Sequence, residues 1–188
     1  MWNGAGPKFL SRVNRIWYAT FVVMFGAMFL SGTFDSSPAG AGEREIKRGK
    51  QIWSNKSTCN RCHGWAGDGR GHPRSPGDAP SLRISELDRE EMRVVIACGV
   101  PGTAMPYHDR HAYKDDRCYG LTEDDLGDDM MPKLGQKPIR ENEIEFVIDY
   151  IEARIKGKGK VTWEECEQYF KVGASRCTKL PRIADLAD

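Results

Sequence analysis

The stretch Cys59-Asn60-Arg61-Cys62-His63 decides the fold of this 188-residue chain. Two thiols three positions apart, with an imidazole directly after the second, form the pattern of covalent haem attachment. Each thiol can add to one vinyl group of a haem to give a thioether, and the neighbouring histidine can then ligate the iron. The motif predicts one covalent haem c, bound through Cys59 and Cys62, with His63 as the proximal iron ligand.

Two other chemistries use paired cysteines, and neither suits this sequence. A structural zinc site would need two further ligands at metal spacing, usually a second Cys-x-x-Cys pair. The other four cysteines occur singly, at positions 98, 118, 166 and 177. A thioredoxin-like redox pair would follow a strand within a βαβ unit, whereas the residues before Cys59 are polar and helix-like.

Residues 1–41 have the features of an export segment. Three basic residues precede an uncharged apolar run over 16–33, and small residues follow at Ala39 and Ala41. This order predicts a secretory signal peptide cleaved after Ala41. The alternative is a retained membrane anchor, because a run of ~18 apolar residues is near the length that spans a bilayer. In both cases the rest of the chain is expected in the periplasm, outside the cytoplasmic membrane.

The charge balance and the cysteine count agree with export. Residues 1–41 hold three of the 28 basic and one of the 27 acidic side chains, which leaves 25 and 26 in the remaining chain, a net charge of −1. A nearly neutral chain argues against nucleic-acid binding. Four cysteines remain after haem attachment, an even number, as is typical of compartments in which disulfides persist.

Helical periodicity predicts a first helix over 42–53 and others over 85–98, 140–156 and 162–170. Gly49 is unusual inside the first, because an interior glycine costs about 1 kcal/mol relative to alanine. We therefore expect another element to approach the backbone closely at Gly49.

Met105 is the candidate for the second axial ligand. It lies in the Gly- and Pro-rich loop 99–106, where a methionine has no evident core role, and a thioether ligand would favour reduced iron. The rivals are a second Met-Pro step at Met131 and three histidines that would give a bis-histidine site, namely His72, His108 and His111. Met92, on a helix face, is expected in the core.

Two segments extend the chain beyond a minimal domain. Residues 107–138 form a long polar insertion rich in Asp and Glu, which is expected to be a solvated acidic loop or a docking rim for a basic partner. A Cys98–Cys118 disulfide would attach it next to the Met105 loop. Residues 157–188 are expected to form a small C-terminal extension closed by a Cys166–Cys177 disulfide, since they are too few to hold a core alone.

Over about residues 43–155 the chain resembles the class I c-type cytochromes. The resemblance rests on Cys-x-x-Cys-His, on the later Gly-x-x-Met-Pro at 102–106, and on a closing helix that contains Val147-Ile148-Asp149-Tyr150-Ile151. It implies an all-α cytochrome c-like fold around one haem, over residues 42–156. It also implies that Gly49 crosses the last helix at Tyr150 or Phe146, that the carbonyl of Pro80 accepts a hydrogen bond from His63, and that Met105 is the distal ligand.

The resemblance further implies an electron carrier rather than an enzyme, since an iron with both axial positions filled has no open site for catalysis. The two added segments are similar to elaborations of periplasmic cytochromes that accept electrons from dedicated dehydrogenases and pass them to a terminal oxidase. The alternatives are a haem subunit of a membrane-bound oxidoreductase, or a five-coordinate haem sensor or enzyme if Met105 does not bind. Two measurements would test the last possibility. The long-wavelength absorption band that the family's Met–Fe(III) bond produces would indicate that Met105 binds, whereas CO binding to the reduced protein would indicate a five-coordinate iron.

Overall fold

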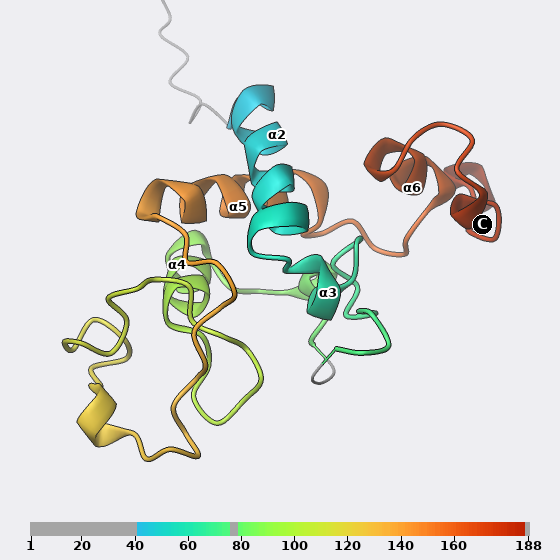
Figure 1. Ribbon diagram of the computed structural model, residues 1–188. Helices are drawn as coiled ribbons and strands as arrows, with labels where there is room; N and C mark the ends of the chain where they lie inside the picture. Colours follow the sequence, from blue (N-terminus) through green and yellow to red (C-terminus); the bar gives the residue numbers. More distant parts are fainter. Residues whose placement is uncertain (1–40, 76–78, 187–188) are drawn as a thin grey trace, which may run out of the picture. The chain divides into compact units, whose positions relative to one another are not determined.

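The computed structural model describes residues 41–75 and 79–186, so residues 1–40, with nearly all of the expected export segment, lie outside the described residues. The described part of the chain is helical, with two isolated bridges and no strands, as the all-α prediction requires. None of the helices in this part has both the length and the apolar character needed to cross a membrane. The α-helices among the described residues are shown in Figure 1: α2 (Glu43–Gln51), α3 (Asn60–His63), α4 (Arg89–Cys98), α5 (Glu141–Arg154) and α6 (Trp163–Tyr169).

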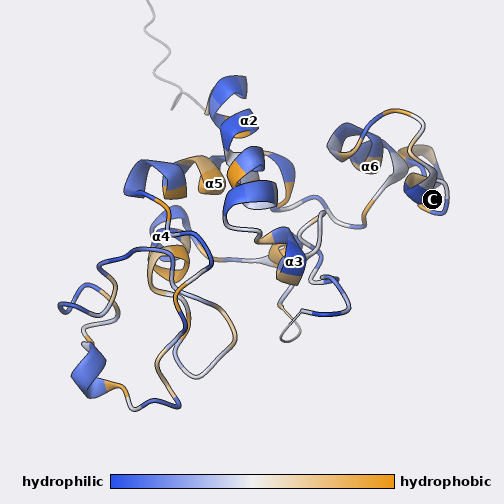
Figure 2. Ribbon diagram, in the orientation of Figure 1, coloured by the Kyte–Doolittle hydropathy of each residue, from blue (hydrophilic) through white to orange (hydrophobic). Residues whose placement is uncertain are grey.

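Helix α2 crosses α5 at Gly49, as the sequence predicted. A Cβ atom at Gly49 would overlap the backbone carbonyl oxygen of Phe146 and lie 2.8 Å from the Cβ of Tyr150. The crossing therefore involves the backbone of one predicted partner and the side chain of the other. Figure 2 shows the contrast between the mostly hydrophilic α2 and the apolar middle of α5.

The main core lies between α2, α4 and α5. A π-helical turn, Ile52–Lys56, continues α2 beyond its expected end and buries Trp53, which is 1% exposed. Met92 is 5% exposed and belongs to this core, as expected. The other buried residues of this core are Ile52, Ile96, Ile139, Ile144, Val147, Ile148, Tyr150, Ile151 and Ile155.

Helix α4 begins at Arg89, four residues later than the prediction from Ser85. The carboxylate of Asp88 accepts from the backbone N–H of Glu91 at 2.9 Å, and the Glu91 carboxylate accepts from the N–H of Asp88 at 2.7 Å. This capping box fixes the first helical residue. Leu87 packs against the core from outside the helix, which explains why its periodicity suggested an earlier start.

The C-terminal extension packs against the part of the chain that carries the attachment motif, and both belong to one compact unit, Gly40–Asp188. Arg83 is 4% exposed and joins the two: its guanidinium donates to the carbonyl of Ala66 at 3.2 Å and of Gly159 at 2.6 Å, and to the carboxylate of Glu165 at 2.9 Å. The hydroxyl of Tyr169 in α6 also bonds Ser54 at 2.7 Å. The extension contains a Cys166–Cys177 disulfide, with the Cα atoms 5.6 Å apart, which is the predicted pairing.

Candidate haem-attachment site

One short helical turn places the three residues of the attachment motif. The backbone N–H groups of Cys62 and His63 both donate to the carbonyl of Cys59, at 3.1 and 2.9 Å. Thr58, just before the turn, has a φ of 53°, a left-handed conformation that redirects the chain from the preceding π-helical turn into α3. The motif is thus fixed by local backbone geometry.

Cys59 and Cys62 are the only cysteines outside disulfides, and all six cysteines lie in the described residues. Both side chains are half-buried. Burial raises the pKa of the Cys59 thiol to about 12, so this sulfur is neutral at physiological pH. The hydroxyl of Ser75 donates to the sulfur of Cys62 at 3.1 Å. The two unbridged thiols are those that the motif assigns to haem.

His63 is held as a neutral, oriented imidazole. Its side chain is 8% exposed, and its Nδ1 lies 3.4 Å from the carbonyl oxygen of Pro80, the position that the family resemblance implied. Burial lowers the pKa of His63, while the Pro80 carbonyl opposes this. A histidine whose Nδ1–H is bonded to a carbonyl presents Nε2 as a basic, fixed metal ligand.

Buried polar atoms beside the motif also fit a haem. Trp53 Nε1, Ser57 Oγ and Asn60 Oδ1 are buried without a hydrogen-bond partner in the described part of the chain. The Trp53 ring lies 6.0 Å from the ring of His63, between centroids. Buried polar groups are normally paired, and the propionate carboxylates of a haem are acceptors suited to the indole and hydroxyl donors. The sequence placed Trp53 only on a helix face, because no local pattern indicated its unpaired N–H.

Met105 lies half-buried in the loop that follows α4. Its N–H donates to the Thr103 hydroxyl at 3.1 Å, and its carbonyl accepts from the N–H of Val100 at 3.3 Å. Its rival Met131 packs instead against a second apolar cluster around Cys98 and Cys118. A packing role for Met131 favours Met105 as the available thioether.

The three candidate histidines lie in different environments. His72 and His111 are exposed, and the Nδ1 of His72 accepts from the N–H of Arg74 at 3.1 Å. His108 is 3% exposed, with an Nδ1 that has no hydrogen-bond partner among the described residues. A Cβ at Gly135 would lie 2.5 Å from that nitrogen, so the ring packs against the Gly135 backbone.

Acid should destabilise the fold through His108. Burial lowers its pKa below the ordinary value of 6.5, although the Lys137 carbonyl opposes the shift. The unfolded chain then binds the proton more readily than the folded chain. The free energy of unfolding is therefore at its full value above pH 6.5, where His108 is neutral in both states, and it decreases as the pH drops toward the folded-state pKa of His108. The slope for one proton is at most about 1.4 kcal/mol per pH unit. Urea unfolding at several pH values should show a flatter profile for His108→Gln, and an unchanged profile would contradict this assignment.

A cavity of about 210 Å³ lies between α2, α5 and α6, lined by Lys50, Trp65, Arg83, Tyr150 and Tyr169 among others. None of the attachment residues lines it. Two of its cationic groups have partners within the fold, since Lys50 donates to the carbonyl of Tyr169 at 2.6 Å and Arg83 donates to the carboxylate of Glu165 at 2.9 Å. We assign the cavity to imperfect packing of the C-terminal extension.

Residues 44–123 match the family model described as cytochrome C oxidase, cbb3-type, subunit III. No curated protein and no solved structure matches the chain. The matched range begins in α2, includes the attachment motif and Met105, and ends within the insertion. Helices α5 and α6 lie beyond it.

Proposed function

We propose that residues 44–123, which match a cytochrome family model, form a c-type cytochrome domain, and that the protein carries single electrons between a periplasmic donor and the respiratory chain. The observation that carries the proposal is the pairing of two unbridged thiols with a buried His63 oriented by Pro80. A bound haem supplies a reversible Fe(II)/Fe(III) couple. The chain holds it through Cys59 and Cys62 and ligates it through His63 and Met105.

The protein's own residues set the reduction potential. The Pro80 carbonyl makes His63 a stronger donor, whereas a thioether from Met105 favours Fe(II). The buried aromatic and aliphatic residues around Trp53 lower the local dielectric and disfavour net charge at the site. If His63 and Met105 both bind the iron of a haem, no coordination position would remain for a substrate, so the chain would act as a carrier and not as an enzyme.

The proposed location is the periplasm. Two disulfides, Cys98–Cys118 and Cys166–Cys177, support an oxidising compartment. The proposed partners are a periplasmic dehydrogenase as donor and a terminal oxidase as acceptor, with the membrane involved only if residues 16–33 are retained.

A second candidate is a haem subunit of a membrane-bound oxidoreductase. It is favoured by the matched family model, whose description is that of an oxidase subunit. Native purification from separated periplasm and detergent-solubilised membranes distinguishes the two, because a subunit would migrate with a large complex. The intact mass of the same material shows whether residues 1–41 have been removed.

Protein matured in a host that attaches c-type haem tests the proposed carrier directly. We expect a Soret band, a mass increase of one haem, and a redox titration that fits a single one-electron step. Binding of CO to the reduced wild-type protein would instead indicate a five-coordinate sensor or enzyme. Absence of the Soret band or of the added mass would overturn the proposed function.

A further inference from the structure

The insertion, residues 107–138, supplies hydrogen-bond donors to the end of α4. The last carbonyl groups of an α-helix have no partner within the helix. The carbonyl of Ala97 accepts from the backbone N–H groups of His108 and Asp109, both at 3.0 Å. The insertion thus begins by capping the helix whose next residues lead to Met105.

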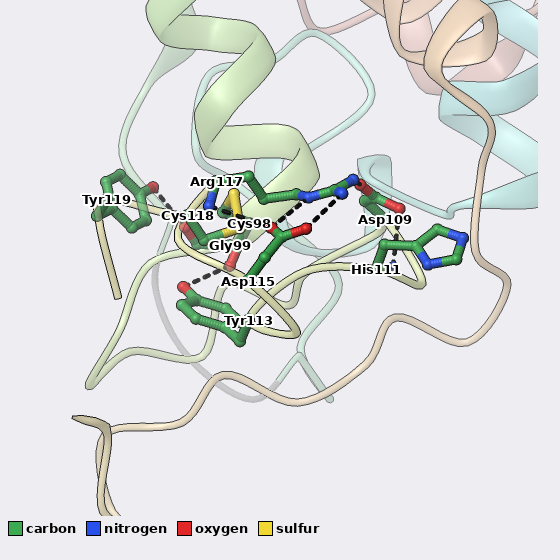
Figure 3. The surroundings of a disulfide bond; sticks show 9 residues. All are labelled: Cys98, Gly99, Asp109, His111, Tyr113, Asp115, Arg117, Cys118 and Tyr119. Carbon is green, nitrogen blue, oxygen red and sulfur yellow. Dashed lines mark hydrogen bonds and ion pairs between the residues drawn. A yellow bond between two sulfur atoms is a disulfide. The ribbon is translucent and has the colours of Figure 1, made fainter. Parts of the chain in front are cut away.

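Two tyrosines of the insertion complete this cap. The Tyr113 hydroxyl donates to the carbonyl of Cys98 at 2.8 Å, and the Tyr119 hydroxyl donates to the carbonyl of Gly99 at 2.6 Å (Figure 3). Tyr113 is 1% exposed, so its hydrogen bond is protected from water. Three consecutive carbonyls, at 97–99, are therefore held by the insertion where the Met105 loop begins.

The backbone at both tyrosines is strained. Tyr113 has a φ of 61° and Tyr119 a φ of 60°, in the left-handed region that bulky side chains rarely adopt. Such conformations are unfavourable for a residue with a side chain and persist only where the surroundings enforce them. The Cys98–Cys118 disulfide is one such restraint, because it joins the end of α4 to a position between the two tyrosines. Both of its cysteines are buried, at 3% and 0% exposure.

The insertion also holds the middle of the Met105 loop, and it is bonded to itself at the residue that follows the loop. The N–H of Gly102 donates to the carbonyl of Met130 at 2.9 Å, and the N–H of Tyr107 donates to the carbonyl of Lys133 at 3.0 Å. The exposed ion pair of Arg117 with Asp115 is drawn beside the disulfide in Figure 3, but exposed pairs contribute little. The insertion thus fixes the loop at its start and in its middle, and the residue that follows the loop, Tyr107, is itself bonded to Lys133.

We propose that the insertion is a positioning device that keeps Met105 on the haem iron, with Tyr113, Tyr119 and the Cys98–Cys118 disulfide as its positioning residues. This inference rests on the proposed function, because it requires a haem with Met105 as its distal ligand. A methionine on a loop leaves the iron whenever the loop moves away. The insertion reduces the fraction of molecules in which Met105 has dissociated from the iron.

Displacement by imidazole at neutral pH measures this fraction. An outside ligand binds only where Met105 has left, so its apparent Kd is its intrinsic Kd divided by the open fraction. Loss of one buried hydrogen bond changes such an equilibrium by roughly tenfold. We expect Tyr113→Phe to bind imidazole about tenfold more tightly than wild type. Loss of the long-wavelength Met–Fe(III) band during the imidazole titration measures this binding. The Cys98→Ser/Cys118→Ser double variant should show at least the same change.

The second disulfide provides a matched control. Cys166→Ser/Cys177→Ser also removes one bridge, but in the C-terminal extension, and should leave the imidazole affinity at the wild-type value. Tyr119→Phe, which removes a hydroxyl from a more exposed ring, tests the device in a variant whose folding is little affected. Wild-type affinity in all the insertion variants, or an equal change in the control, would overturn the proposal.

Measurements on the wild-type protein distinguish failure of this inference from failure of the proposed electron-carrier function. Protein without haem would overturn the proposed function. A haem protein that lacks the long-wavelength band but undergoes one-electron reduction would overturn the positioning role alone. The positioning role alone would also be overturned if the wild-type haem protein shows the band but Tyr113→Phe and Cys98→Ser/Cys118→Ser bind imidazole with wild-type affinity.

Discussion

Met105→Ala should lower the reduction potential by on the order of 0.1 V, within the ~0.8 V range over which axial ligands tune haem proteins. The thioether stabilises Fe(II) relative to Fe(III), so its loss favours the oxidised state. An alanine leaves the distal position open, and the reduced variant should bind CO whereas the wild type does not. Spectroelectrochemical titration and CO difference spectra measure the two effects.

Met131→Ala is the control, since Met131 is the other methionine next to a proline. It packs in the cluster around Cys98 and Cys118, so its loss should reduce the stability of the insertion and retain the long-wavelength band. Retention of the band in Met105→Ala together with its loss in Met131→Ala would assign the ligand to Met131. Retention in both would indicate a different ligand set.

The attachment motif could be predicted because its geometry is local. Cys59, Cys62 and His63 lie within one helical turn, so their spacing in sequence determines their spacing in the fold. The crossing at Gly49 could also be predicted, since an interior glycine in a helix has few explanations other than close approach. The role of the Pro80 carbonyl as acceptor for His63 could be predicted only from the family resemblance, because no property of a single loop residue indicates which carbonyl a distant ring will face.

The role of the insertion could not be predicted in this way. Its acidic composition indicated a solvated loop or a docking rim, yet Tyr113 is buried and its hydroxyl bonds Cys98, 15 residues away. Arg83 was likewise missed, because an arginine in a polar stretch is normally solvated and only tertiary contacts bury it between Ala66 and Glu165. Contacts between segments distant in sequence decide both cases, and neither periodicity nor composition records them.

Gly49→Ala should destabilise the haem-loaded protein by about 3 kcal/mol or more. Two effects oppose each other at this position. Alanine is favoured over glycine in a helix interior by about 1 kcal/mol, but its Cβ would overlap the carbonyl oxygen of Phe146 and lie 2.7 Å from the carbonyl carbon. A main-chain group within α5 cannot rotate aside as a long side chain can, so α2 must move away from α5 and the core around Trp53 and Ile148 must open. The overlap therefore outweighs the gain in helix propensity.

Urea unfolding followed by the Soret band measures the loss, and Gly127→Ala is its matched control. Gly127 is exposed, its φ is not positive, and a Cβ there would have no atom within 4 Å, so the same substitution should change stability by no more than about 0.5 kcal/mol. A Gly49→Ala variant as stable as Gly127→Ala would mean that the two helices do not meet at this glycine. Because the π-helical turn that continues α2 leads into the attachment motif, displacement of α2 should also lower the yield of haem-loaded protein, which the ratio of Soret to protein absorbance reports.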